Sequence, residues 1–261
     1  MRIRRFVYLI FSLIALIFLA ALSITYNNTF FFILMMIIIL IPNNIIKNKE
    51  RSITSDIISR YGYQCDPYQY IDDMKKYAKK CLLTKKQKRL YNLYYALAYI
   101  DAGDFEKVKE RLLEIDQISD ELDEVTQILY LKAWCDYFFY NNLDEKMKFT
   151  LLKMRDIITN SNNNALKANY SIIYMLLEAK YYVIAGVHLD KARELFKNRK
   201  ALIPTKLSMI GSNYQLALLD IKENNFRAAK DKLILVAKNN DRLHIVRCAK
   251  KILERIDNYI V

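Results

Sequence analysis

Glycine and proline are scarce in this chain, which contains only four glycines and three prolines among its 261 residues. Tight β-hairpin turns and the loops that cradle phosphates both depend on glycine, because they use backbone conformations that other residues adopt poorly. The scarcity therefore argues against hairpin-rich β folds and against glycine-rich nucleotide-binding loops.

Histidine and cysteine are also sparse, and neither forms a pattern typical of a metal or catalytic site. His188 and His244 have no neighbouring histidine, cysteine or carboxylate at ligand spacing, so each is expected to be solvated or packed. The four cysteines are widely separated and are expected to be reduced, mostly buried thiols. Glu145, Glu178 and Glu194 are single acids, and no Walker loop, nucleophile elbow, HExxH motif or EF-hand loop occurs. We therefore expect no enzymatic activity, no cofactor and no small-molecule substrate.

Charged residues are missing between positions 6 and 46, where two apolar runs occupy residues 6–22 and 30–46. A helix that crosses a bilayer needs roughly 20 mostly apolar residues. We therefore expect a transmembrane hairpin within residues 1–50, with spans at about 6–23 and 28–46. Pro42, Asn43 and Asn44 interrupt the second run, so that a re-entrant or interfacial segment is the alternative there.

Basic residues flank this stretch on both sides. Because lysine and arginine favour the cytoplasmic side, both termini are expected in the cytoplasm, in an inner-membrane protein of bacterial type. A cleavable signal peptide ending at Ala21-Leu22-Ser23 is the competing interpretation. The flanking basic residues are Arg2, Arg4 and Arg5 before the first run, and Lys47, Lys49 and Arg51 after the second.

The remaining residues, 51–261, are expected to form one cytosolic domain in a chain of net charge +13. Its densest basic cluster is expected to contact anionic lipid headgroups, with an ordinary solvated helix face as the alternative. No helix-turn-helix, RNA-binding aromatic motif or zinc finger supports nucleic-acid binding. The cluster comprises Lys75, Lys76, Lys79, Lys80, Lys85, Lys86, Lys88 and Arg89.

Beyond residue 66, apolar residues recur at helical spacing, and one pattern repeats. A long helix containing an alanine ends in a short polar turn. An apolar docking residue then packs the turn against the helices, and a second helix follows. A small residue at the alanine position lets the two antiparallel helices of a hairpin approach closely. The alanines are Ala96, Ala133, Ala179 and Ala217, and the docking residues are Phe105, Leu143, Leu189 and Phe226.

The best copy, Tyr95-Ala96…Tyr99…Gly103-Asp104-Phe105…Val108…Leu112, resembles the tetratricopeptide repeat family. The resemblance covers roughly residues 87–240 and implies an α-solenoid of helical hairpins, which a helix at 241–259 would cap. The repeats are longer than the family's usual length of about 34 residues. In addition, Asp136 and Asp220 stand where the family usually has an aromatic residue.

Such solenoids bind peptides or partner helices on a concave face lined by the first helix of each pair. By resemblance, the residues after the small positions project near that groove, and Tyr130 and Tyr137 could join them. Trp134 is the single tryptophan, and tryptophan is enriched at binding hot spots, although core packing is the alternative. The predicted groove residues are Leu97, Tyr130, Trp134, Tyr137, Lys180 and Leu218.

Taken together, these patterns predict an all-α protein with an N-terminal two-helix transmembrane hairpin followed by a tetratricopeptide-like solenoid. The expected function is binding: a membrane-anchored scaffold or adaptor that holds a protein or peptide partner at the cytoplasmic face. A self-immunity protein or a peptide-sensing regulator is the alternative.

Overall fold

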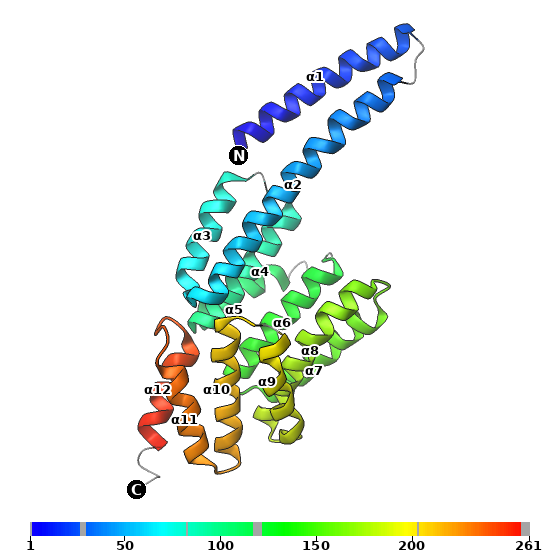
Figure 1. The fold of residues 1–261 in the computed structure, drawn as a ribbon. Helices are drawn as coiled ribbons and strands as arrows, with labels where there is room; N and C mark the ends of the chain where they lie inside the picture. Colours follow the sequence, from blue (N-terminus) through cyan, green and yellow to red (C-terminus); the bar gives the residue numbers. More distant parts are fainter. Residues whose placement is uncertain (1, 27–29, 82, 117–121, 203, 257–261) are drawn as a thin grey trace. The chain divides into compact units, whose positions relative to one another are not determined.

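The computed structural model describes the chain apart from residues 1, 27–29, 82, 117–121, 203 and 257–261, and all regular elements in the described part are α-helices (Figure 1). The all-α prediction is therefore confirmed. The helices are α1 (Arg2–Tyr26), α2 (Phe30–Gln64), α3 (Pro67–Lys80), α4 (Lys85–Ala102), α5 (Phe105–Asp116), α6 (Glu124–Tyr140), α7 (Asp144–Asn160), α8 (Asn164–Ala185), α9 (Leu189–Leu202), α10 (Lys206–Lys222), α11 (Phe226–Ala237) and α12 (His244–Ile256).

The predicted transmembrane hairpin is wrong. A membrane span needs length and a predominantly apolar composition in the same helix. Among the residues that the structure describes, α1, α2 and the other helices do not meet this combined requirement. The spans at 6–23 and 28–46, and the inner-membrane location with both termini in the cytoplasm, are corrected accordingly. The backbone of α2 also stays helical through Pro42, where the sequence predicted an interruption.

The chain divides into two compact units, and the division falls within α2 and α3. The first unit comprises Met1–Arg60 and Asp72–Thr84, and the second comprises Tyr61–Ile71 and Lys85–Val261. In the first unit, Tyr77 of α3 donates a hydrogen bond to the carbonyl of Glu50 (3.4 Å). In the second unit, Asp66 caps the start of α3 by accepting a hydrogen bond from the backbone N–H of Gln69 (3.1 Å).

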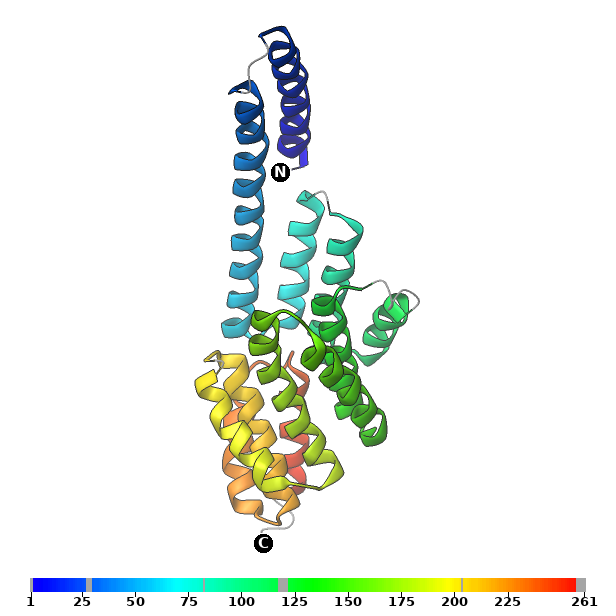
Figure 2. The same cartoon turned by 90° about the vertical axis from the view of Figure 1, so that its right-hand side faces the viewer.

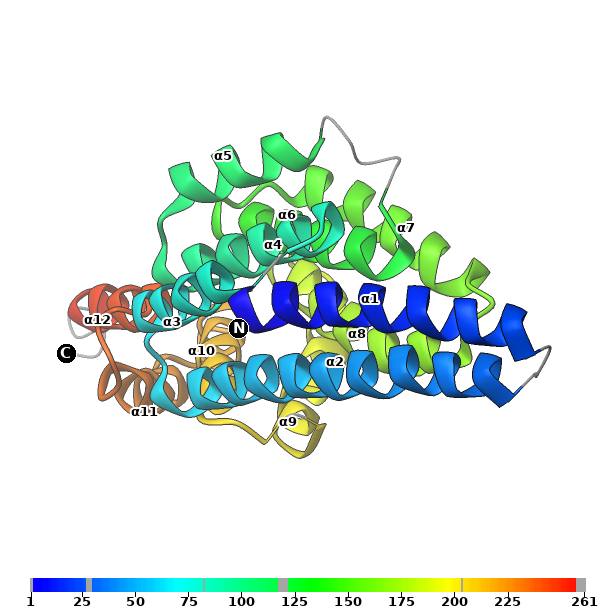
Figure 3. The ribbon, with the colours of Figure 1, turned by 90° about the horizontal axis from the view of Figure 1, so that it is seen from above.

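The second unit is built from helix pairs. α4 packs on α5, α6 on α7, α8 on α9 and α10 on α11, and the first helices α4, α6 and α8 follow one another in space (Figure 3). One or two residues after the end of each first helix, a residue adopts the left-handed conformation. This conformation lets the chain reverse direction within a few residues. These residues are Gly103, Asn142, Gly186 and Asn224, with φ between 52° and 72°.

The four repeat alanines explain the close approach within the pairs. Ala96, Ala133, Ala179 and Ala217 are all fully buried, with 0 % of their surface exposed. A larger side chain at these positions would separate the two helices, because protein interiors are closely packed. The alanine pattern of the sequence thus marks the contact line of each pair as expected.

The last helix closes the array onto its beginning. α12 packs on α11 and α10 and also contacts α4; Figure 2 shows α11 and α12 in orange and red. Arg247 donates a hydrogen bond to the carbonyl of Ala102 at the end of α4 (2.6 Å). Arg242 forms an ion pair with Asp66 (2.7 Å). Arg247 thereby joins the two ends of the array.

Candidate partner-binding groove

Three aromatic side chains form a stripe along α6. Tyr130, Trp134 and Phe138 are spaced four residues apart, so that they lie one above another on the same helix face. Trp134 stacks on Phe138 with ring centroids 5.2 Å apart and contacts Tyr130 edge-on at 6.4 Å. The stripe therefore offers a continuous aromatic surface rather than three isolated rings.

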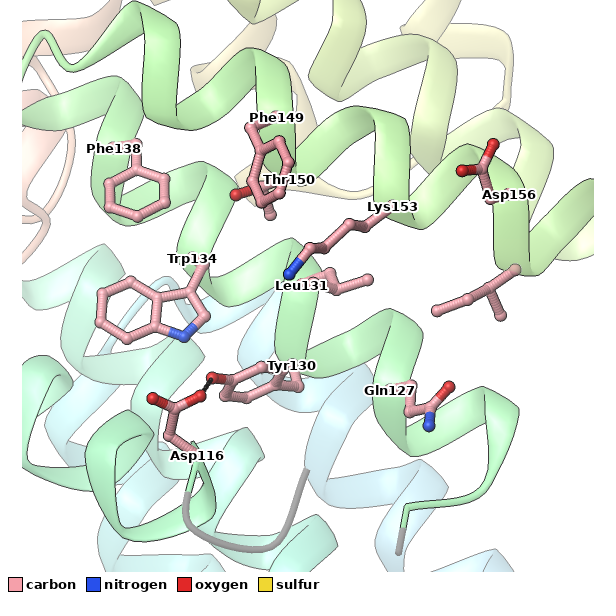
Figure 4. Close-up of a pocket in the computed structure, with 11 residues that line it drawn as sticks. Asp116, Gln127, Tyr130, Leu131, Trp134, Phe138, Phe149, Thr150, Lys153 and Asp156 are labelled. Carbon is pink, nitrogen blue, oxygen red and sulfur yellow. Dashed lines mark hydrogen bonds between the residues drawn. The ribbon is translucent and has the colours of Figure 1, made fainter. Parts of the chain in front are cut away.

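This stripe forms the floor of a groove of about 490 Å³, whose walls come from α5 and α7 (Figure 4). The volume lies in the range of pockets that hold a small ligand or a few side chains of a partner. Phe149 on α7 is 60 % exposed and lines the groove. The lining residues are Asp116, Gln127, Tyr130, Leu131, Trp134, Phe138, Phe149, Thr150, Lys153, Asp156 and Ile157.

Asp116 places a carboxylate beside the aromatic stripe. The Tyr130 hydroxyl donates a hydrogen bond to Asp116 Oδ1 (2.6 Å), which orients the acid across the end of α5. Burial, followed by this hydrogen bond and the nearby negative charge, raises the pKa of Tyr130 above its ordinary value. The phenol therefore stays protonated and keeps donating. Among the described residues, no lysine or arginine forms an ion pair with Asp116, which is solvent-exposed.

Lys153 extends from α7 across the middle of the groove (Figure 4). Its ammonium lies 4.7 Å from the centroid of the Phe149 ring, a distance at which a cation is attracted to the face of an aromatic ring. Asp156 lies further along α7 and forms an ion pair with the exposed Arg155 (4.0 Å). The groove thus contains two acids, one base and an aromatic floor.

Two of the six predicted groove residues, Tyr130 and Trp134, line this groove, and the other four lie elsewhere. Tyr137 packs edge-on against Trp134 (5.5 Å) and Phe105 (6.0 Å), on another side of α6. Leu97 is half-buried on α4, and Leu218 packs against two core clusters. Lys180 is 13 % exposed and forms an ion pair with Asp136 (2.6 Å). The groove is lined by the first helix α6 and the second helix α7, with Asp116 of α5, whereas the resemblance implies a face lined by first helices.

Asp136 and Asp220 stand where the resemblance implies aromatic residues. Both are buried, and each forms ion pairs with two basic side chains. Asp136 is 5 % exposed and accepts hydrogen bonds from Lys132 (2.7 Å) and Lys180 (2.6 Å), which ties α6 to α8. Burial raises the pKa of Asp136, but the two lysines outweigh burial and hold the pKa below its ordinary value.

Asp220 is 2 % exposed and pairs with Arg193 (2.8 Å) of α9 and Lys232 (2.6 Å) of α11. This acid therefore joins three consecutive helices. Both aspartates thus make ionic contacts between helices of different pairs.

A second polar cluster lies where the array closes. The Tyr61 hydroxyl donates a hydrogen bond to Asp101 (2.5 Å), and burial raises the pKa of Asp101 above its ordinary value. His244 packs edge-on against Phe105 and Tyr140, each at 5.1 Å between ring centroids. Burial, together with nearby Arg247 and Lys251, lowers the pKa of His244 to about 4.

His244 also has a cysteine neighbour that the sequence pattern did not bring out. Cys248 lies one helical turn later on α12, and its sulfur is 3.3 Å from His244 Nε2. Burial raises the pKa of Cys248, so that this pair consists of a protonated thiol and a neutral imidazole near pH 7. Such a pair lacks the thiolate needed for nucleophilic attack. No group of three potential metal ligands occurs among the described residues.

The basic cluster is divided between the two units. Lys75, Lys76, Lys79 and Lys80 are exposed on the part of α3 that belongs to the first unit. Lys85, Lys86, Lys88 and Arg89 belong to α4 in the second unit, where Lys86 pairs with Asp123 (3.4 Å). Contact of these residues with anionic lipids stays a prediction.

No protein-family model, curated protein or solved structure matches this chain.

Proposed function

We propose that this protein is a binding module that holds a segment of a protein partner in the groove formed by α5, α6 and α7. The observation that carries the proposal is the aromatic floor of Tyr130, Trp134 and Phe138, bordered by α7 and by Asp116 at the end of α5. Tyrosine and tryptophan supply large contact areas at low entropic cost and are enriched at hot spots of protein interfaces. A groove along two packed helices suits an amphipathic helix that inserts a few anchors.

The helix pairs from α4 to α11 support the same proposal. We interpret them as tetratricopeptide-like repeats on the basis of their buried alanines and docked turns. Arrays of this kind present rigid surfaces, and rigid surfaces lose little conformational entropy when a partner binds. The proposed role is therefore that of a scaffold or adaptor. A peptide-sensing role would use the same groove, with a free peptide as its occupant.

Site-specific photo-crosslinking tests the proposal. A photoreactive phenylalanine analogue replaces Phe149 in the groove or, as the matched control, Leu235 on α11, which is 53 % exposed and lies outside the groove. Both positions are exposed apolar residues on second helices, so both substitutions should leave the helical circular dichroism unchanged. In cells, we expect a discrete adduct with one protein or peptide at position 149 alone. Equal adducts at both positions, or no adduct at position 149, would contradict a partner site in the groove.

A further inference from the structure

We infer that the segment bound in the groove is basic: an amphipathic helix whose apolar anchors flank an arginine that pairs with Asp116. This inference rests on the proposed function and specifies its partner. It concerns a segment of a separate protein.

The charge of the groove favours a cationic occupant. The chain as a whole carries a net charge of +13, yet the groove is lined by two carboxylates and one ammonium. Asp116 has no cationic partner among the described residues, and the single ammonium, Lys153, offsets only one of the two lining carboxylates. The net charge of the lining side chains is therefore negative, which favours a cationic partner.

The geometry around Asp116 favours arginine over lysine. The Tyr130 hydrogen bond holds the carboxylate beside the stripe, so that little freedom is lost when a guanidinium binds it. A guanidinium is planar, forms two parallel hydrogen bonds with a carboxylate and stacks on aromatic faces, whereas an ammonium is a strongly hydrated point charge. Lys153 on Phe149 shows that this groove accommodates a cation against an aromatic ring.

Trp134 provides a direct readout, because it is the only tryptophan of the chain and lines the groove. The probes are three synthetic amphipathic helices of leucine and alanine that differ only in one set of polar positions: arginine, the neutral isostere citrulline, or glutamate. The titrations use the full chain at about 0.15 M salt, where exposed charges further apart than about 8 Å are screened. Binding elsewhere, for example of the glutamate peptide to basic surfaces, leaves the Trp134 emission unchanged.

We expect the arginine peptide to shift the Trp134 emission and to saturate. The citrulline peptide should bind roughly tenfold more weakly, as expected for the loss of a charged hydrogen bond. Asp116→Asn should lower the affinity for the arginine peptide by a similar factor and should leave the affinity for the citrulline peptide unchanged. The matched control is Glu110→Gln, which alters an exposed acid of the same helix outside the groove and should change neither affinity.

The outcomes separate the partner assignment from the binding function. Equal affinity for the arginine and citrulline peptides, or tighter binding of the glutamate peptide, would overturn the basic partner and retain a binding groove. An emission unchanged by all three peptides would overturn both. An emission change that depends on protein concentration without peptide would identify a second copy of the chain as the occupant and would also overturn the inference.

Discussion

Asp136 and Asp116 lie on neighbouring helices and carry the same carboxylate, but they differ in burial and in their bonding partners. Asp136 on α6 is 5 % exposed and is held by two lysines, one of them from α8. Asp116 at the end of α5 is exposed, and its hydrogen bond comes from a neutral tyrosine. A buried charge is tolerated only when it is paired, whereas an exposed charge is stable in water without a partner. The first acid therefore holds the array together, and the second is available for an external cation.

Asp136→Ala should have the largest effect, because it leaves the ammonium of Lys180, 13 % exposed, without its carboxylate. Breaking a buried pair by removing one partner costs about 4 kcal/mol. Urea unfolding followed by circular dichroism should show this loss. The double variant Asp136→Leu/Lys180→Met, which removes both buried charges, should recover much of the stability. A loss below about 1 kcal/mol in the single variant would mean that the acid does not hold α6 and α8 together.

Gly103→Ala should have the next largest effect, a loss of about 3 kcal/mol in the free energy of unfolding. Gly103 has φ of 72°, a conformation that costs other residues about 1–2 kcal/mol, and an added Cβ would lie 2.4 Å from His244 Nδ1. Gly186→Ala is the matched control, because its φ is 70° but an added Cβ would meet no atom within 4 Å. The difference between the two variants measures the contact of α12 with the first turn. Equal losses would show that this contact contributes nothing.

His244 should make stability depend on pH in a smaller way. Its pKa is about 4 in the folded chain, below its ordinary value of 6.5, so that the unfolded chain binds the proton first. The contribution of neutral His244 is thus present above pH 6.5 and is lost as the pH falls towards 4. The raised pKa of Asp101 acts in the opposite direction. Urea midpoints between pH 7 and 4.5 should fall less steeply in His244→Gln than in the unmodified chain, and parallel curves would exclude this role.

Asp116→Asn should have the smallest effect on folding. Asp116 is exposed, and the side-chain oxygen of asparagine can still accept the hydrogen bond of the buried Tyr130 hydroxyl, so that stability should change by no more than about 0.5 kcal/mol. The same urea experiment should therefore give this variant nearly the same free energy of unfolding as the unmodified chain, although its affinity for the arginine peptide falls. A stability loss close to that of Asp136→Ala would show that Asp116 is a structural acid after all.

The sequence predicted the helix pairs well and the binding surface only partly. Alanines and docking residues recur along the chain, and they report local packing within one hairpin, so that Ala96 and Phe105 could be identified without the structure. The four-residue spacing of Tyr130, Trp134 and Phe138 was a further local signal, which would have added Phe138 to the predicted groove residues. Asp116, Phe149 and Lys153 carry no such signal, because they reach the groove only through the packing of α5 and α7 on α6.

The N-terminal region shows the opposite result. Hydropathy and flanking charge predicted two membrane spans, whereas no helix in the described part of the chain satisfies the combined requirement of length and apolarity. The second apolar run belongs to a longer helix, α2, which continues to Gln64 through Lys47, Lys49 and Glu50.

The sequence by itself determined the helices, their turns and the alanine lines along which they pair, because these depend on residues only a few positions apart. The tertiary structure alone decided which acids are neutralised, where the groove lies and how the array closes. Lys180 with Asp136, and Arg247 with the carbonyl of Ala102, join segments that are remote in the chain. Such pairings follow from how the helices pack in three dimensions, and a local pattern of residues does not encode them.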